Sequence, residues 1–514
     1  RYGELFEGGE DLSSPYGSLV FTGVENDPGT LETLARMGFS EPATVSDTIR
    51  SWHHGRIQAT RTARGRELFT RLAPQLLTAV AKTGAPDAAF RRFAVFFSGL
   101  SAGVQVQALF LNQPKLFDLV VGVMAFAPRL ARALGRQPQA LDGVLDARFM
   151  TALGTDTGLA DQVVREAHEA GDFEGAMNAV RRLHREQTFR IGMHVVTGRT
   201  TAEQAGLTYT SLADACMKGL APAALAEAER MGGAFDGAVA VVALGKAGSR
   251  EMTAGSDLDL MTVYAAPPEA VSAGRGWSAE TFYGRFTQRL IAALSAHTAE
   301  GGLYEVDMRL RPTGSKGPVS VRLETLQAYY AEEADTWEFM ALTRARVVWA
   351  SDATFAPRVT TALEEALRRP RPGVDVAHDV RAMRDLMDRE RRPKGFWDLK
   401  LSAGAQVDAE FVGQYRQLEA AAGGSTLSVS TLEALKGDPI LADSWRMHQQ
   451  LSQLTACAFE DRNDPDQEPS GFQKRLAATI GAPDFDTLKA RLIDLRMRAR
   501  RAFDAVLPPI RDGN

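Results

Sequence analysis

The sequence contains few cysteines and no long apolar run. Cys216 and Cys457 are its only cysteines, and residues so far apart do not form the short spacing of a zinc or redox motif. Scarce cysteine is typical of a reducing compartment, so we expect a cytoplasmic protein. Apolar runs such as residues 238–244 are far shorter than the roughly 18 residues that cross a membrane. Since no signal peptide is recognisable either, the sequence predicts no membrane association.

Neither sign of charge dominates the sequence. The net charge is −5, with 24% charged and 45% apolar residues, which argues against a disordered tail and against a strongly basic nucleic-acid binder. We therefore expect no nucleic-acid partner. The length of 514 residues predicts three domains, at roughly 150 residues per domain. The chain begins at Arg1 without a methionine, and we expect it to be part of a longer protein.

Two common nucleotide-binding motifs are also missing. The sequence contains no G-x-x-x-x-G-K-[ST] loop and no G-x-G-x-x-G fingerprint. It therefore predicts neither a Walker loop nor a dinucleotide-binding turn, and a phosphate site in this chain has to be built differently.

Helical spacing occupies both ends of the chain. After a loop rich in Gly, Ser and Pro, residues 1–145 carry apolar residues at helical intervals, and one helix is predicted to begin at Asp27 and Pro28. Residues 356–514 are predicted to be helical again, with a break around Pro370. Each end should form helices packed on helices.

The middle region, residues 146–355, changes from helices to strands. Strand-like segments occur at 237–245, 257–264 and 302–310, and a helix-like segment at 278–299 precedes the last of them. We predict a predominantly α-helical protein with an embedded α/β domain, which contains a mixed sheet and is flanked by helical domains.

The second predicted strand begins with two aspartates. Asp257 and Asp259 are two residues apart, so both point to one side of the strand with their Cα atoms roughly 7 Å apart. Two like charges at this distance repel unless a cation lies between them. Asp307 occurs on the third predicted strand, and three carboxylates on neighbouring strands can bind two Mg²⁺ ions. The alternative is that the pair protects a sheet edge or forms a turn.

A glycine-rich segment with a lysine precedes these aspartates. Glycines let the backbone approach phosphate oxygens closely, and a lysine adds positive charge. The alternative is a plain turn, in which Ser256 only caps the turn. The predicted nucleotide-binding residues of this segment are Gly245, Lys246, Gly248, Ser249, Gly255 and Ser256.

Two arginines follow Asp307 at alternate positions. Arg309 and Arg311 should therefore share its face of the predicted strand, where guanidinium groups can bind nucleotide phosphates. The alternative is that they only neutralise the carboxylates.

Further charged residues follow in two helical segments. Glu338, Arg344 and Arg346 do not share one helical face, and we expect some of them to be ordinary surface or interdomain charges. Asp408 and Glu410 are two residues apart on a predicted helix, so they should point to different sides and not bind one ion together. For this pair we favour solvated acids beside an apolar stripe.

The order of these motifs resembles one known family. A strand that ends in glycine, a D-x-D pair on a second strand and an aspartate on a later strand resemble the nucleotidyltransferase fold of the polymerase β type. More closely, four stretches are similar to the glutamine synthetase adenylyltransferases, which are bifunctional adenylyl-transferring and adenylyl-removing enzymes. They are ALGKAGSREMTAGSDLDL, YEVDMRLRPTGSKGPVSV, TWEFMALTRARVV and DLKLSAGAQVDAEFVGQ, within residues 243–414. The last departs from the family pattern, which prefers Gly-Gly at Gly404 and Ala405, and the role of Lys400 stays open.

The resemblance implies an activity and a place in a longer protein. Such enzymes carry two nucleotidyltransferase domains, of which the first removes AMP and the second transfers it. Because only one D-x-D unit occurs here, between helical regions, the chain resembles the C-terminal, adenylyl-transferring half, and residues 146–355 would hold its nucleotidyltransferase domain. We expect AMP transfer from ATP to a tyrosine hydroxyl of glutamine synthetase, without the removing activity.

The resemblance also implies the cofactors and partners of the reaction. Asp257, Asp259 and Asp307 would be the catalytic residues and the ligands of two Mg²⁺ ions, and Asp307 would also act as the base. Glutamine synthetase would be the protein substrate, with the PII signalling protein and glutamine as regulators. Two other functions stay open, namely a related uridylyltransferase that acts on another protein, and a helical scaffold that senses nucleotide without catalysis.

Overall fold

The structure is a computed structural model that forms two compact units. It describes residues 19–21, 23, 25–136, 153, 157–460 and 464–510. Most of the predicted N-terminal loop and the predicted boundary near residue 145 lie outside these residues. The first unit comprises Arg1–Thr151, Gly192–Arg199 and Leu454–Phe485, and the second comprises Ala152–Ile191, Thr200–Gln453 and Asp486–Asn514.

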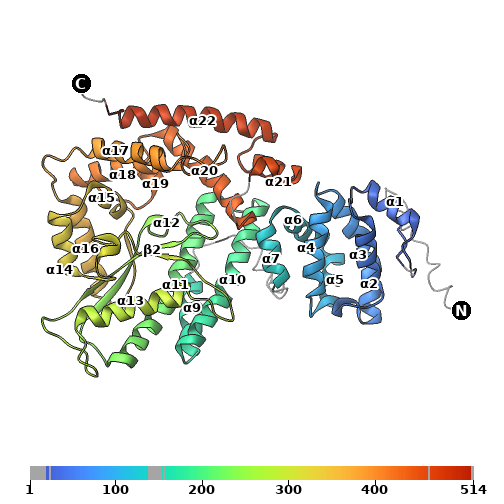
Figure 1. Cartoon of the computed structure of the whole chain (residues 1–514), viewed down its shortest axis with the longest axis horizontal. Helices are drawn as coiled ribbons and strands as arrows, with labels where there is room; N and C mark the ends of the chain where they lie inside the picture. The colour runs from blue at the N-terminus through green and yellow to red at the C-terminus, as the bar shows by residue number, and fades with distance from the viewer. Residues whose placement is uncertain are drawn as a thin grey trace. The chain divides into compact units, whose positions relative to one another are not determined.

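The described part of the first unit is a bundle of helices around an aromatic core (Figure 1). As predicted, its first helix begins at Asp27, whose carboxylate accepts a hydrogen bond from the backbone N–H of Thr30 at 2.7 Å. Buried rings of Trp52, Phe69 and Phe97 pack against one another. Its helices are α1 (Pro28–Arg36), α2 (Pro42–His53), α3 (Ala63–Ala81), α4 (Pro86–Ser98), α5 (Gly103–Asn112), α6 (Pro114–Phe126), α7 (Pro128–Arg136) and α21 (Ser470–Thr479).

Among the described residues, no single helix combines the length and the apolar character that crossing a membrane requires. The neighbouring helices α5 and α6 meet this criterion only when they are taken together, and they are bent by 112° where they join.

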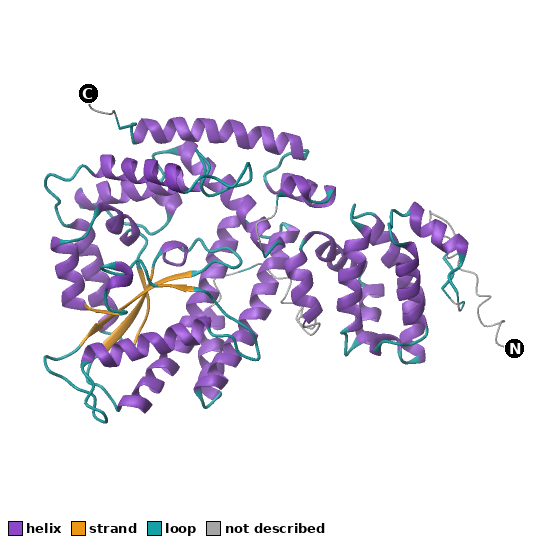
Figure 2. Cartoon of the chain, in the orientation of Figure 1, coloured by secondary structure: helices purple, strands orange, loops and turns teal. Residues whose placement is uncertain are grey.

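The second unit combines helices with one small sheet (Figure 2). This confirms the predicted fold class, a helical protein with an embedded α/β domain. The helices that lie in this unit wholly or for most of their length are α9 (Thr157–Glu169), α10 (Phe173–Thr197), α11 (Ala202–Gly232), α12 (Gly245–Ser249), α13 (Ala279–Ser295), α14 (Leu323–Glu332), α15 (Thr336–Leu342), α16 (Phe355–Arg368), α17 (Val376–Glu390), α18 (Gln406–Ala422), α19 (Thr431–Ala434), α20 (Pro439–Ala458) and α22 (Phe485–Val506).

The sheet has the mixed topology that the sequence predicted. Strand β1 pairs with β2 and β5 in antiparallel fashion, whereas β3 and β4 both pair with β2 in parallel. Along the main path the strand order is β3-β2-β1-β5. The strands are β1 (Ala238–Ala243), β2 (Leu258–Ala265), β3 (Val306–Asp307), β4 (Ser320–Arg322) and β5 (Arg346–Ala350).

Helices cover both faces of the sheet. Because side chains alternate along β2, its successive residues contact the helices of one face and then those of the other. Met261 and Val263 share a hydrophobic core with helices α14, α15, α16 and α18. Thr262 points to the opposite face, where its hydroxyl lies 2.7 Å from that of Thr287 in α13. Helices that follow residue 355 in the sequence therefore help to build the core of the sheet. The predicted division into 1–145, 146–355 and 356–514 stays a prediction.

The third strand is much shorter than predicted. Only Val306 and Asp307 form β3, whereas the sequence predicted a strand over 302–310. The backbone N–H of Arg309 donates to the Asp307 carboxylate at 2.8 Å, and this local bond turns the chain out of the sheet. Arg309 and Arg311 therefore do not continue a strand.

Candidate active site

Two of the three predicted catalytic aspartates lie at the start of β2. Asp257 is exposed and directly precedes the strand, and Asp259 is its second residue and is partly buried. Alternation along the strand places Asp259 on the face that Met261 and Val263 share. The carboxylate of Asp259 therefore lies at one end of the sheet, on the face covered by α14 to α16 and α18.

The third aspartate lies beside Asp259 on the neighbouring strand. The parallel pairing of β2 and β3 matches Leu258 with Val306 and Asp259 with Asp307. Neighbouring strands are about 4.8 Å apart, so paired residues of this kind project side by side. The register thus brings the three predicted aspartates to one edge of the sheet.

The charges of these aspartates act on one another. Burial, and then the charges of Asp257 and Asp307, raise the pKa of Asp259 to about 6. Asp307 behaves in the opposite way, because hydrogen bonds from Arg309 hold the pKa of its carboxyl below the ordinary value. Asp259 thus carries an excess of negative charge around it, whereas Asp307 already has a cationic partner.

Arg309 grips Asp307 through several contacts. Its Nε donates to both carboxylate oxygens of Asp307, at 2.8 and 3.0 Å, and its Nη2 donates to Oδ2. The Arg309 side chain is 77% exposed, so it is free to leave this partner for another anion. Arg309 therefore lies at the site, paired with Asp307, and its predicted phosphate contact stays a prediction.

The three aspartates have the side chains that bind a divalent cation, but Asp307 is paired with Arg309. Among the described residues, no three carboxylate, histidine or cysteine side chains converge closely enough to hold a metal ion as they stand. Asp307 pairs with Arg309 instead. Carboxylate oxygens are the ligands that Mg²⁺ prefers, and the repulsion that raises the pKa of Asp259 is what such an ion would relieve. The three aspartates therefore fit Mg²⁺ if Arg309 releases Asp307.

The glycine-rich segment meets Asp259 at Gly245. The N–H of Leu244 donates to the carbonyl of Asp259 at 2.9 Å, which joins the end of β1 to the start of β2. Gly245 has φ +51, and a Cβ atom there would lie 2.0 Å from Oδ2 of Asp259. Only glycine allows this approach, because any side chain would displace the carboxylate.

The following residues form the short helix α12 rather than an open loop. Helix α12 contacts β2 (Figure 1). Gly248 and Ser249 are buried in it, and a Cβ atom on Gly248 would lie 1.8 Å from the carbonyl oxygen of Arg344. This close packing explains why residue 248 is a glycine. The predicted nucleotide contacts of Gly248 and Ser249 stay predictions.

The end of the segment forms a turn. The Ser256 hydroxyl accepts a hydrogen bond from the N–H of Thr253 at 2.9 Å, and Gly255 between them is exposed with φ +73. This is the turn cap that the sequence left open as the alternative for Ser256. It leads the chain directly into Asp257.

The side chain of Arg311 binds the protein's own backbone. Its guanidinium donates to the carbonyls of Met308, Gly317 and Pro318 at 2.6, 3.1 and 2.8 Å, and the residue is 8% exposed. These bonds fix the loop after β3. Each of the three guanidinium nitrogens of Arg311 thus donates to a backbone carbonyl, and its predicted phosphate contact stays a prediction.

Lys246 is the cation of the glycine-rich segment that stays close to the site. Burial lowers its pKa, and the charge of Glu410 opposes that shift. Glu410 in turn forms an ion pair with Arg344 at 3.4 Å. Asp408, two residues before Glu410, is fully buried against Arg384 and so points to a different neighbour.

One prediction about these charged residues was wrong. Asp408 and Glu410 are not solvated acids, because arginines from neighbouring elements pair with both. Arg344 is 7% exposed, and its ion pair with Glu410 joins the predicted regions 146–355 and 356–514, as expected of an interdomain charge. Arg346 forms a two-point ion pair with Asp214 of α11 at 2.8 and 2.9 Å.

Glu338 is also buried. It is 4% exposed, accepts the Tyr329 hydroxyl at 2.7 Å and caps helix α15. The sequence also gave no reason to select Glu251, which is buried and accepts both the N–H and the hydroxyl of Thr431 at 2.8 Å. The contacts between Glu251 and Thr431 join residues that are 180 apart in the sequence, so sequence spacing could not predict them.

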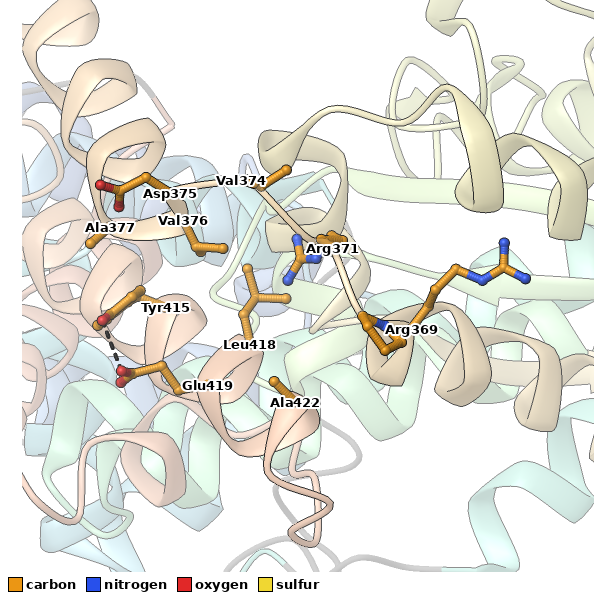
Figure 3. A pocket seen from close by; sticks show the side chains of 12 residues that line it. Arg369, Arg371, Val374, Asp375, Val376, Ala377, Tyr415, Leu418, Glu419 and Ala422 are labelled. Atoms are coloured by element: carbon orange, nitrogen blue, oxygen red, sulfur yellow. Dashed lines mark hydrogen bonds between the residues drawn. The ribbon is translucent and has the colours of Figure 1, made fainter.

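An open pocket of about 600 Å³ lies between the segment that joins α16 to α17 and helix α18 (Figure 3). Arg371, Tyr415, Leu418 and Glu419 are among the side chains that line it, and the Tyr415 hydroxyl donates to Glu419 at 2.8 Å. All lining residues come from residues 369–377 and 415–422, so this pocket is separate from the three aspartates.

The family and the relatives that the chain resembles all carry the name of one kind of enzyme. Residues 117–361 match the sequence profile of a family described as glutamate-ammonia ligase adenylyltransferase. Three similar relatives are each named "bifunctional glutamine synthetase adenylyltransferase/adenylyl-removing enzyme". They come from Caulobacter vibrioides (56% identity over 519 residues), Brucella suis (39% over 520) and Rhizobium meliloti (39% over 523). These alignments cover 99% of the chain but 52 to 53% of each relative, so the chain spans about half their length.

Proposed function

We propose that this chain, whose residues 117–361 match the glutamate-ammonia ligase adenylyltransferase family, transfers AMP from ATP to a tyrosine hydroxyl of glutamine synthetase. The names of the relatives join a transferring to a removing activity, and we assign the transferring one to this chain. The observation that carries the proposal is the register of β2 and β3, which pairs Asp259 with Asp307 beside the Gly245 turn.

The proposed reaction is a displacement at the α-phosphorus of ATP. A bond forms between the tyrosine oxygen and this phosphorus, the bond to the bridging oxygen breaks, and its electron pair leaves with pyrophosphate. A phenol has an ordinary pKa of about 10, so a base has to accept its proton at neutral pH. Asp307 is our candidate, since its lowered pKa keeps it ionised and the Arg309 side chain that pairs with it is 77% exposed, so burial does not hold the arginine in place.

Asp257, Asp259 and Asp307 are also the residues that would hold Mg²⁺, and we propose two ions. Bound there, Mg²⁺ would neutralise charge on the triphosphate and on the three carboxylates. We extend the proposal to regulation by glutamine and by the PII signalling protein, which would change the rate of transfer.

The test is the transfer of label from ATP labelled in its α-phosphate to purified glutamine synthetase, with Mg²⁺ present. We expect labelling by the chain and none by Asp257→Asn or Asp259→Asn. Asp443→Asn is the matched control, because Asp443 is an exposed aspartate that pairs with Arg446 on a helix surface. It should label at the rate of the unmodified chain.

Three parallel assays separate the alternatives. Labelling from UTP but not from ATP would indicate a uridylyltransferase. Phosphate-dependent release of AMP from modified glutamine synthetase would assign the removing activity to this chain. Failure to bind ATP with Mg²⁺ would favour a scaffold without catalysis.

A further inference from the structure

The segment between α17 and α18 contains an exposed lysine, Lys400, on a loop that buried charged residues hold in place. Asp398 lies two residues earlier and is 4% exposed. Its Oδ1 accepts hydrogen bonds from the backbone N–H groups of Lys400 and Leu401 at 3.1 and 2.9 Å, and its Oδ2 accepts one from Lys394 at 3.1 Å. One buried carboxylate thus fixes the backbone on both sides of itself.

A second buried charged residue fixes the backbone of the same loop. Arg496 of α22 is 9% exposed and donates to the carbonyls of Phe396 and Asp398 at 2.7 and 3.2 Å. Gly404 follows with φ +75, and a Cβ atom there would lie 2.0 Å from the carbonyl oxygen of Arg496. Burying charges in this way is costly unless they are fully paired, so the loop is held in one conformation.

The loop continues into α18, which lies over the sheet face of Asp259. The N–H of Val407 donates to the carbonyl of Lys400 at 3.1 Å, which ties the lysine to the first turn of the helix. Further along, Ala409 and Val412 of α18 share the core of Met261 and Val263. Since Asp259 projects from this same face, the loop and the aspartates lie on one side of the sheet.

The charge of Lys400 acts on two residues of this region. It opposes the rise in the pKa of Asp259 that burial and the neighbouring carboxylates cause, and it adds to the lowering of the pKa of Lys246 that burial causes. Lys246 and Lys400, which are 154 residues apart in the sequence (400 minus 246), therefore repel each other near the start of β2. Two repelling cations in a rigid setting suit a ligand with several negative charges.

We propose that Lys400 binds the triphosphate of the nucleotide, next to Lys246, and stabilises the charge that develops on the departing pyrophosphate. This inference rests on the proposed function, because it assigns a phosphate ligand for the proposed ATP substrate. Lys400 is exposed, whereas Gly248, Ser249 and Arg311 are buried. The helices after residue 355 then do more than support the sheet, since they position a residue that touches the substrate.

A different result is expected if Lys400 acts only through its charge on the aspartates. If Lys400 only neutralised the aspartates, its loss would matter in the absence of metal and would be compensated once Mg²⁺ is bound. A phosphate contact instead affects ligands according to the number of their phosphates. ATP and pyrophosphate would bind more weakly without the lysine, and AMP would bind as before.

The experiment therefore compares Lys400→Ala, Lys400→Arg and the unmodified chain for binding of ATP, pyrophosphate and AMP at saturating Mg²⁺. We expect Lys400→Ala to weaken ATP and pyrophosphate by about 10- to 100-fold, as for one charged hydrogen bond, and to leave AMP unchanged. Lys400→Arg should recover most of the loss. Lys394→Ala is the control, because Lys394 is an exposed lysine of the same loop.

Equal binding of all three ligands by Lys400→Ala and the unmodified chain would overturn the inference, as would equal weakening of AMP and ATP. Melting temperatures within about 1 °C would show that the variants are folded. If the unmodified chain binds ATP through Lys400 but does not label glutamine synthetase, the proposed function fails and the inference stands. If it labels glutamine synthetase and Lys400→Ala binds ATP equally well, only the inference fails.

Discussion

Asp259 and Asp307 are partners across two neighbouring strands, yet their environments differ sharply. On the β2 side, burial and two neighbouring carboxylates raise the pKa of Asp259 to about 6. On the β3 side, Arg309 keeps the pKa of Asp307 below its ordinary value. The difference arises from the length of the strands, because β3 ends at Asp307 and the turn that follows returns Arg309 to it.

This contrast shows that one edge of a sheet can hold two neighbouring carboxylates of different kinds. Asp307 is paired with an arginine, whereas Asp259 is crowded by other carboxylates. The β2 side is suited to a cation, since burial and the carboxylates around Asp259 outweigh the charges of Lys400 and Arg309. The β3 side has an exposed arginine, Arg309, which we expect to exchange one anion for another. The predictions below remove or exaggerate this difference, from the largest effect to the smallest.

The largest effect is expected from Asp259→Asn, which removes the uncompensated charge. We expect transfer activity to fall by at least about 100-fold. Stability should change in the opposite direction, since a raised carboxyl pKa means that the ionised form is disfavoured in the folded state. At pH 7 to 8 without Mg²⁺, we expect a gain of about 1 to 3 kcal/mol in the free energy of unfolding.

The pH dependence of this gain follows from the sign of the shift. Below about pH 4, Asp259 is protonated in both the folded and the unfolded state, so the variant should lose its advantage as the pH falls from about 6 to 4. Urea unfolding at pH 4, 6 and 8 measures this trend. A variant that is less stable at pH 8 would show that Asp259 has a cationic partner after all.

The second prediction concerns the contact between Gly245 and Asp259. In Gly245→Ala, the new methyl group would overlap Oδ2 of Asp259 and would strain a residue with positive φ. We expect a loss of about 2 to 4 kcal/mol in stability and a loss of activity of at least tenfold. Gly424→Ala is the control, because Gly424 has φ +72 and no atom lies within 4 Å of its Cβ position.

Since Gly424→Ala carries backbone strain without a clash, it should cost only about 1 kcal/mol and leave transfer unchanged. Equal losses of stability and activity in the two variants would mean that strain alone, and not the approach to Asp259, explains Gly245. Thermal unfolding and the labelling assay give both quantities.

The sequence predicted the β2 side of the site better than the β3 side. Alternation places Asp257 and Asp259 on one face, and the hydrophobic pattern predicts the strand that carries them. The end of β3 could not be predicted in this way, because a local bond between Arg309 and Asp307 stops a segment whose composition favours a strand. For the same reason, Arg311 was expected on a strand face and instead anchors a loop.

The surrounding helices were the least predictable part of the site. The ion pair of Arg344 with Glu410 and the contact of Glu251 with Thr431 depend on how α18 and α19 pack on the sheet. Spacing within one helix carries no information about such partners. Lys400 was visible in a motif, but the role that we propose for it depends on the position of the loop that Asp398 holds.

The third prediction uses the difference in pKa directly. Mg²⁺ binds ionised carboxylates, so protonation of Asp259 should weaken it. Between pH 7 and 8 we expect a constant half-saturation concentration of Mg²⁺, because the carboxyl groups of Asp259 and Asp307 are both ionised there. From pH 6 to 5 it should rise by up to about tenfold, since one proton competes at Asp259. Thermal shift as a function of Mg²⁺ concentration measures this value, and a flat profile down to pH 5 would contradict the prediction.

The smallest effect is expected from Arg309→Ala, which should make the two sides of the site alike. Without hydrogen bonds from Arg309, the pKa of Asp307 should rise toward that of an ordinary or crowded carboxyl group. Asp307 would also be free to share a cation with Asp259, so Mg²⁺ should bind a few-fold more tightly at pH 7. Carboxyl carbon resonances followed through a pH titration report the pKa, and thermal shift reports the binding of Mg²⁺.

Arg230→Ala separates this local effect from a general loss of positive charge. Arg230 is as exposed as Arg309 and pairs with Glu227 at 2.7 Å, away from the three aspartates. It should leave the binding of Mg²⁺ unchanged. If the two variants alter Mg²⁺ binding equally, long-range charge explains the effect; if neither does, Arg309 does not compete with the cation for Asp307. A gain confined to Arg309→Ala would identify the exchange of Arg309 for a cation as the step that converts the β3 side into a metal ligand.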